Sequence, residues 1–339
     1  MENLSPRRVN NQNRPQLRRP RLSATLFIVR TIVTESPKEA AAIIRRGGIV
    51  AFPTETVYGL GAHLFDEAAI RRIFEAKKRP ADNPLIAHVG DVSYLKDVSP
   101  VVNAAAQRLI DAFFPGPLTV VLPKRSPVPP IATAGLSTIG VRMPGNQIAR
   151  EFLVACGAAI VAPSANLSGR PSPTTWQAVL EDLDGRIDAI LQGDQAEVGI
   201  ESTVVDCTTN PPVVLRKGAV SLAELQKVVS EIIDAELSES AAVRSPGLRH
   251  KHYAPRAKVE IVKSGAAVGD RDGYIGLHEP SGQADLKTVC STVEEYAHSL
   301  FEFFRECDRR GMERILCECV DENGIGAALM DRIKRAAAV

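Results

Sequence analysis

The sequence lacks several features by which nucleotide-binding, membrane and secreted proteins are recognised. It has no GxxxxGK[ST] phosphate loop, and Gly59-Leu60-Gly61 lacks the rest of a dinucleotide fingerprint. No apolar run reaches the roughly 18 residues of a spanning helix, and the beginning of the chain has no apolar stretch typical of a secretory signal. We therefore expect a cytoplasmic protein, and any nucleotide it binds must be held by isolated side chains.

Metal ligands and nucleophiles are also scarce. Of the six cysteines, only Cys317 and Cys319 lie close together, and no second pair completes a four-ligand zinc site. We expect core or surface thiols, with no metal held by protein side chains. None of the six histidines stands beside an obvious serine or cysteine nucleophile, which argues against a catalytic triad.

The composition is that of an ordinary globular protein. The 339 residues are 45% apolar and 24% charged, with 41 basic residues against 40 acidic ones. The length favours two domains. A net charge of +1 indicates nothing about nucleic-acid partners.

Basic charge is concentrated at the start of the chain. Residues 1–25 contain six arginines and a single acid, Glu2, with few apolar residues. Such a segment cannot bury enough surface to offset its ordering entropy, so we expect a disordered basic arm. It is either a solvated tail or an arm that binds the phosphate backbone of RNA.

Helical and strand patterns alternate after the arm. Ser36-Pro37 predicts a helix start with Glu39 in a capping box, Asp66 caps a helix that ends near Lys77, and Ser99-Pro100 opens another helix. Short apolar strands such as IVAFP, LTVVLP, AAIVAP and STVVD lie between the helices. The pattern predicts an α/β fold with a mixed sheet.

A change in composition marks the boundary between two domains. Residues 233–257 lose periodicity and gain Ser, Pro, His and Arg, as expected of an interdomain linker. Residues 258–339 then read as strand, strand, helix, strand and helix, which indicates a small α/β domain.

Three polar segments could carry chemistry. In KKRPADNPL, the spacing of Lys77 and Arg79 in an extended segment would aim both cations to one side, as a polyphosphate requires, although a solvated helix end would also be cationic. In PSAN, Ser164 and Asn166 follow a strand and suit phosphate oxygens, or serve as turn residues. PTETVYGLGA packs polar residues against two glycines, which suggests a small-ligand loop or a tight turn.

PTETVYGLG, KKRPADNPL, GVRMP, PSAN and ESTVVD occur in an order that resembles the YrdC-type domain of threonylcarbamoyl-adenylate synthases. The segments SPGLRHKHYAP and GIGAALMDRIKRAA look like the two-domain branch, so the resemblance covers about residues 28–338. It implies a YrdC-like twisted mixed sheet with flanking helices over 26–232 and a small Rossmann-like C-terminal domain.

The resemblance implies a nucleotidyltransferase that makes threonylcarbamoyl-AMP and pyrophosphate from ATP, L-threonine and bicarbonate. The product would pass to downstream threonylcarbamoyl-transfer machinery that modifies an adenosine of tRNA. Mg²⁺ would bridge the phosphates. Such a transfer depends on positioning and charge neutralisation, which suits a chain without a triad.

The resemblance also implies site residues. ATP would be bound by Lys77, Arg79, Ser164, Asn166, Ser202 and Arg216, with Lys77 and Arg79 as catalytic cations. Threonine would be bound by Thr54, Tyr58, His88 and Arg142. Lys217 departs from the proline expected after the arginine, which weakens the assignment of Arg216. His252-Tyr253 would cover the site as a lid; a plain ordered linker is the alternative.

Two other functions fit parts of the sequence. A non-catalytic RNA-binding module would use the basic arm and show steep salt dependence without ATP turnover. A carbamoyl-transfer protein of the hydrogenase-maturation type shares the domain, but it would carry paired CxxC zinc motifs upstream, and the sequence has none.

Overall fold

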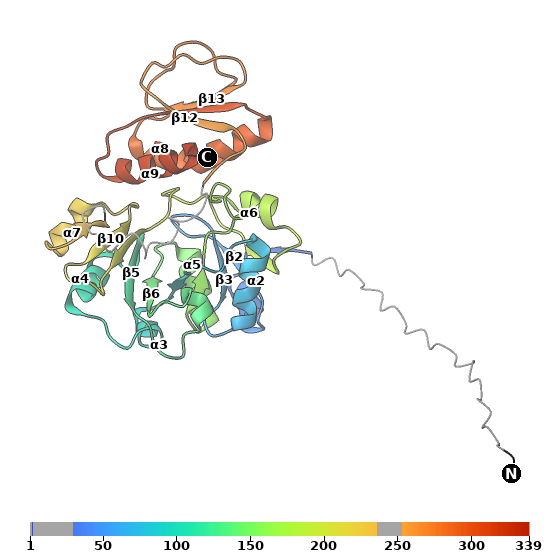
Figure 1. Cartoon of the computed structure of the whole chain (residues 1–339), viewed down its shortest axis with the longest axis vertical. Helices are drawn as coiled ribbons and strands as arrows, with labels where there is room; N and C mark the ends of the chain where they lie inside the picture. Colours follow the sequence, from blue (N-terminus) through green and yellow to red (C-terminus); the bar gives the residue numbers. More distant parts are fainter. Residues whose placement is uncertain (1, 3–29, 236–252, 339) are drawn as a thin grey trace.

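The computed structural model describes residue 2, residues 30–235 and residues 253–338. Residues 30–235 form an N-terminal unit and residues 253–338 a C-terminal unit, which lie one above the other (Figure 1). Apart from Glu2, the basic arm lies outside the described residues, as does His252. None of the helices in the described ranges is long and apolar enough to cross a membrane.

A single sheet organises the N-terminal unit. Its order is β1-β8-β2-β3-β7-β4-β6-β5-β9-β10-β11, and it combines parallel and antiparallel pairs, so the expected mixed sheet is confirmed. The strands are β1 (Ile32–Thr34), β2 (Val50–Phe52), β3 (Gly59–His63), β4 (Ile86–His88), β5 (Leu118–Pro123), β6 (Thr138–Arg142), β7 (Ile160–Ala162), β8 (Ala189–Leu191), β9 (Thr203–Asp206), β10 (Val213–Arg216) and β11 (Ile233–Asp234). The sheet thus extends two residues past the boundary expected at residue 232.

Helices cover both faces of this sheet. Successive side chains of a strand point to opposite faces, so Val50 and Phe52 pack in one apolar cluster with α1 and α5, and Ala51 packs in another with α2 and α4. The helices are α1 (Pro37–Arg45), α2 (Glu67–Lys77), α3 (Leu95–Val98), α4 (Ala104–Phe113), α5 (Gln147–Cys156), α6 (Trp176–Leu183) and α7 (Leu222–Val228), with short 3₁₀ turns η1 (Val92–Tyr94) and η2 (Pro130–Thr133).

Local capping chemistry fixes where these helices begin. Ser36 and Asp66 cap α1 and α2 as predicted, since each side chain accepts the backbone N–H three residues ahead. The start predicted at Ser99-Pro100 is wrong: the Ser99 hydroxyl bonds the Val101 carbonyl in a local turn, and Asn103 caps α4 instead.

The C-terminal unit contains a parallel sheet in the order β12-β15-β13-β14. Its elements are β12 (Lys258–Val262), β13 (Asp272–Gly276), β14 (Leu286–Val289), α8 (Val293–Arg310), β15 (Arg314–Glu318) and α9 (Ile325–Ala337). Strand β14 was not predicted from the sequence. It lies at the edge of the sheet, and its residues alternate between half-buried and exposed, so it lacks a continuous apolar run.

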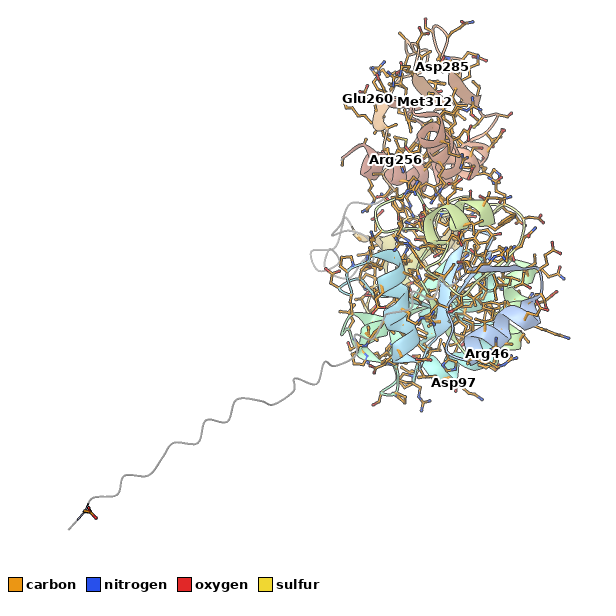
Figure 2. The ribbon with its side chains drawn as sticks, turned by 90° about the vertical axis from the view of Figure 1, so that its right-hand side faces the viewer. Arg46, Asp97, Arg256, Glu260, Asp285 and Met312 are labelled. Carbon is orange, nitrogen blue, oxygen red and sulfur yellow. The ribbon has the colours of Figure 1, made fainter. Side chains whose placement is uncertain are left out.

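The two units share apolar and ionic contacts. Helices α8 and α9 lie between the small sheet and the N-terminal unit (Figure 1), and Val57 and Ile200 of the N-terminal unit pack in the apolar core of the C-terminal unit. Figure 2 shows Arg256 on the side of the C-terminal unit nearer the junction, and Glu260 and Asp285 toward its far end. The junction between the two units is therefore part of the packed structure.

Candidate active site

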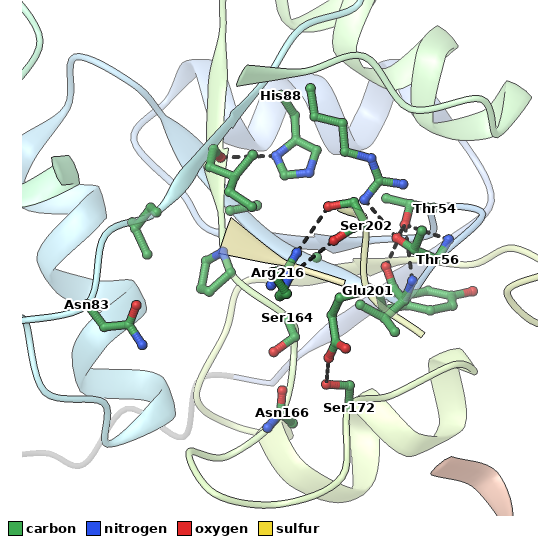
Figure 3. A pocket seen from close by; sticks show the side chains of 18 of the residues that line it. Thr54, Thr56, Asn83, His88, Ser164, Asn166, Ser172, Glu201, Ser202 and Arg216 are labelled. Atoms are coloured by element: carbon green, nitrogen blue, oxygen red, sulfur yellow. Dashed lines mark hydrogen bonds between the residues drawn. The ribbon is translucent and has the colours of Figure 1, made fainter. Parts of the chain in front are cut away.

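A polar cavity lies where several strands of the large sheet end (Figure 3). Its walls come from the loop between β2 and β3, the segment before β4, residues of β4, β6 and β10, the segment between β7 and α6, the residues just before β9, and Tyr253. Four arginines line it: Arg79, Arg142, Arg170 and Arg216. The space is therefore suited to an anionic ligand.

One wall joins the loop between β2 and β3 to Arg142. The Arg142 Nη1 donates to Thr56 Oγ1 at 2.7 Å, and its Nη2 lies 2.8 Å from Glu55 Oε1. Burial raises the pKa of Glu55, but the Arg142 charge together with hydrogen bonds from Arg142 and the backbone holds that pKa below its ordinary value.

His88 lies beside Arg142 because β4 and β6 are parallel neighbours with these two residues in register. Burial, and then the Arg142 charge, lower the pKa of His88 to about 3, so its imidazole is neutral at pH 7. Its Nδ1 lies 3.1 Å from the Ile86 carbonyl, which assigns the proton to Nδ1 and leaves Nε2 as an acceptor.

Thr54 and Tyr58 were both expected in the threonine pocket. Thr54 lines the cavity, and its hydroxyl donates to the Val57 carbonyl at 2.6 Å. Tyr58 also contributes to the wall, but its fully buried hydroxyl bonds the Gly193 backbone at 2.9 Å. Tyr58 therefore fastens the loop that carries Thr54.

The interpretation of the Lys77 and Arg79 spacing required an extended segment, but the two residues do not lie in one. Lys77 ends α2 and Lys78 adopts a left-handed conformation, so the chain turns between the two cations. Lys77 is buried outside the cavity lining, and its ammonium donates to the Ser164 and Asn166 carbonyls at 2.6 and 2.5 Å. Arg79 lines the cavity, where burial lowers its pKa to about 10, so it stays charged at pH 7.

Ser164 and Asn166 line the same cavity, as expected of a shared site. Gly59 and Ser164 form a bridge that ties their loop to β3. The Asn166 amide donates to the Leu167 and Arg170 carbonyls at 2.8 and 2.9 Å, which leaves its Oδ1 without a partner in the described chain.

Ser202 and Arg216 meet in the wall, where Ser202 directly precedes β9 and Arg216 ends β10. Arg216 donates to the Ser202 carbonyl and hydroxyl, both at 3.0 Å, and Thr119 Oγ1 lies 2.8 Å from the same hydroxyl. The antiparallel pairing of β9 and β10 brings the two residues together. Lys217 leaves this contact intact.

Tyr253 is the one residue of the expected lid within the described ranges, and it lines the cavity. Its ring stacks on Phe301 of α8 at 5.4 Å and lies under the Arg332 guanidinium of α9 at 5.4 Å. The C-terminal unit thus supplies the support for this tyrosine.

Sequence reasoning missed Asn83, Ser172 and Glu201, which also line the cavity. Ser172 donates to Glu201 at 2.5 Å, while Asn83 Oδ1 has no partner in the described chain. Asn83 and Glu201 lie inside quoted motifs, yet an asparagine or glutamate beside a strand gives no pattern that separates a ligand contact from a turn.

Buried polar atoms without partners gather in this cavity. Among the described residues they include Arg79 Nε, Asn83 Oδ1 and Asn166 Oδ1. Because an unpaired buried polar atom costs about 1 to 3 kcal/mol, such a group indicates a ligand that supplies the missing partners.

Comparison with known families covers both units. Residues 42–218 match a family profile described as telomere recombination, and residues 220–338 match one described as threonylcarbamoyl-AMP synthase, C-terminal domain. The threonylcarbamoyl-AMP synthase of Pyrococcus abyssi is 44% identical, across 88% of this chain and 92% of that protein. The Bacillus subtilis protein of the same name is 39% identical, with the same coverage.

Solved structures resemble the whole described arrangement. P. abyssi Sua5 complexed with L-threonine superposes with a TM-score of 0.83 at 41% identity, covering 91% of this chain and 97% of that one. A P. abyssi Sua5 variant in which a histidine and the following tyrosine are replaced by alanine gives a TM-score of 0.82 at 40% identity, covering 91% and 96%.

Proposed function

The chain belongs to the threonylcarbamoyl-AMP synthase family, and we propose that it condenses ATP, L-threonine and bicarbonate into threonylcarbamoyl-AMP and pyrophosphate. The observation that carries the proposal is the cavity itself, where four arginines and several unpartnered polar atoms meet. A polyphosphate and a small zwitterion would satisfy these groups together. The named relatives support the synthase and neither alternative.

The chemistry needs positioning more than a protein nucleophile. Threonine's amine attacks the carbon of bicarbonate and water leaves, which gives a carbamate; a carbamate oxygen then attacks the α-phosphorus as pyrophosphate leaves. Transfer of the nucleotidyl group in this way makes the protein a nucleotidyltransferase. The arginines stabilise the charge that develops on the phosphate oxygens.

We assign threonine to the wall formed by Thr54, Thr56, His88 and Arg142. Arg142, whose Nη2 also faces Glu55, would bind its carboxylate, whereas the acceptor Nε2 of neutral His88 suits its ammonium or hydroxyl group. The related P. abyssi protein was solved with L-threonine, which supports the presence of an amino-acid pocket in this fold.

ATP takes the opposite wall in this proposal. Arg79, Ser164, Asn166, Ser202 and Arg216 would contact its phosphate and ribose oxygens, with Lys77 supporting the loop from beneath. The cavity carboxylate, Glu201, is already ion-paired with Arg332, so the Mg²⁺ expected with ATP would be carried by phosphate oxygens. That ion would neutralise phosphate charge.

The finer biological context also belongs to the proposal. Tyr253 would shield the hydrolysable carbamate from water, and the product would feed tRNA modification through a downstream threonylcarbamoyl-transferase. Direct contact with tRNA and a cytoplasmic location stay predictions.

The decisive experiment is pyrophosphate release from ATP, with threonine and bicarbonate omitted in turn. Release should require both, and threonylcarbamoyl-AMP should appear in equal amount by mass spectrometry. Equal release without either substrate would show simple ATP hydrolysis and refute the proposed reaction.

A further inference from the structure

One arginine of the C-terminal unit reaches the wall of the cavity. Arg332 of α9 is completely buried, although arginine is rarely buried unless paired. Its Nε donates to Glu201 at 2.8 Å, its Nη2 to the Lys217 carbonyl at 2.9 Å, and its Nη1 to Asp331 at 2.6 Å. A single guanidinium thus holds two separate segments of the N-terminal unit.

Both segments lead directly to residues of the proposed ATP wall. Glu201 precedes Ser202, and Lys217 follows Arg216. Arg216 itself donates twice to Ser202. Arg332 therefore bonds the two residues that flank this contacting pair, Glu201 and Lys217. The planar guanidinium fixes two directions at once, which a lysine ammonium does not.

Arg332 also contacts Tyr253. The guanidinium carbon lies 5.4 Å from the centre of the tyrosine ring, within the range of a cation–π contact. Glu201, Lys217 and Tyr253 belong to three separate segments, and Arg332 contacts all three.

We propose that Arg332 is a positioning residue for ATP, so that the C-terminal unit completes the nucleotide site by aligning Ser202, Arg216 and Tyr253. The inference rests on the proposed synthase function. The C-terminal unit would thereby take part in substrate binding, a role that neither sheet of the fold indicates.

Another arginine at the same junction provides the contrast. Arg309 of α8 also crosses to the N-terminal unit, where it pairs with Glu181 of α6 at 2.9 Å, but it is partly exposed and outside the cavity lining. Its contact ties the units together without leading to Ser202 or Arg216. Arg309→Lys therefore makes the same chemical change without disturbing the ATP wall.

The test compares Arg332→Lys with Arg309→Lys in the full-length protein. Arg332→Lys should raise the KM for ATP and the Kd for a non-hydrolysable ATP analogue by about 10-fold or more, as loss of supporting contacts does at other ligand sites. The KM for threonine should change by less than about 3-fold. Arg309→Lys should leave all three values at the wild-type level.

A second variant separates positioning from folding. Glu201→Gln keeps the shape of the side chain but removes its charge, and should raise the KM for ATP in the same way. Combined with Arg332→Lys it should add little, because contacting residues that act through one interaction are not additive. This variant also decides the matter if Arg332→Lys does not fold.

The inference is overturned if Arg332→Lys or Glu201→Gln lowers the melting temperature while analogue binding and the KM for ATP stay at the wild-type level. Fully additive effects in the double variant would also contradict it. Failure of the wild-type protein to release pyrophosphate would instead refute the proposed function, and analogue binding would still test the role of Arg332.

Discussion

Among single side chains, the two cations of KKRPADNPL have different surroundings. Arg79 lines the cavity with an unpartnered Nε, whereas Lys77 holds two backbone carbonyls beneath it. The same loss of activity should therefore arise in two ways, from a missing phosphate contact at Arg79 and from a displaced Ser164–Asn166 loop at Lys77.

Substitution separates the two roles. Arg79→Ala should lower pyrophosphate release by about 100-fold or more, as removal of a charge-stabilising donor does elsewhere, with little change in the free energy of unfolding. Lys77→Met should lower release as strongly and also destabilise the fold by about 1 to 3 kcal/mol for each carbonyl left unpaired. Enzyme assays and urea titration measure both effects. Equal stability of the two variants would contradict the supporting role of Lys77.

His88 should make stability depend on pH. Its pKa is about 3 in the folded protein against 6.5 ordinarily, so between these values the unfolded chain binds a proton that the folded chain does not. The free energy of unfolding should therefore fall as pH decreases from 6.5, by up to about 1.4 kcal/mol per pH unit. His88→Gln should reduce this slope in urea titrations at pH 7 and pH 5. An unchanged slope would mean that another group is responsible.

Among the elements, the segment before β9 packs tightly against α8. Gly199 has a φ of +80°, and a Cβ added to it would lie 2.4 Å from the His298 Cα. Only a residue without a side chain allows this approach of loop and helix. The contact lies next to Ile200 and Glu201, which reach the C-terminal core and the cavity respectively.

Gly199→Ala should therefore lower the free energy of unfolding by more than backbone strain alone would. Gly157 offers a matched control, because its φ is +71° and a Cβ there would meet no atom within 4 Å. We expect the free energy of unfolding to fall by about 1 kcal/mol for Gly157→Ala and by at least about 3 kcal/mol for Gly199→Ala, measured by chemical denaturation. Equal losses would show that the junction yields to the added methyl group.

Local sequence determined some of these elements well and others poorly. Ser36 and Asp66 are recognisable as helix caps because a cap bonds a backbone N–H only three residues away. Asn103 and β14 were missed because Ser99-Pro100 offered a competing signal and an edge strand buries too little to show a pattern.

The candidate site was predictable only in part. The ordered motifs point to Arg79, Ser164 and Asn166, and these residues do line one cavity. The surroundings of Lys77 and the contact of Arg332 with Glu201 depend on segments distant in the chain, as the separations of 87 residues between Lys77 and Ser164 and 131 residues between Arg332 and Glu201 show. No periodicity or spacing in one sequence reports such contacts.

At the scale of the whole molecule, the two units should unfold together. Arg305 of α8 is buried and pairs with Asp182 of α6 at 2.9 Å, and the apolar core of the C-terminal unit includes Val57 and Ile200. This interface combines buried apolar contacts with a buried ion pair, unlike the polar interfaces that let domains move independently.

Fluorescence of the single tryptophan, Trp176, reports on α6, while circular dichroism reports on the whole chain. Their melting curves should coincide in the wild-type protein, and Arg305→Gln should lower the single transition by several degrees by removing the more buried of the two arginines that pair with Asp182. A second transition in the wild-type protein would show independent units.

Removal of residues 1–25 should leave pyrophosphate release within about twofold of the wild-type rate, because the cavity residues that the structure describes all lie at Thr54 or beyond. Tight, salt-sensitive binding of tRNA by the full chain but not by the shortened one would assign the arm to RNA contact. A large loss of turnover would contradict its expected independence from catalysis.

The apolar contact at the junction also limits how this protein can be shortened. Val57 lines the cavity and belongs to the core of the C-terminal unit, together with Ile200 and Tyr253. A chain ended after residue 235 would expose Val57 and Ile200 to water at the mouth of its own active site, and exposed apolar patches promote aggregation. A soluble single-unit enzyme made from this sequence would need polar replacements at both positions, and Val57 would have to be replaced inside the wall of the candidate site.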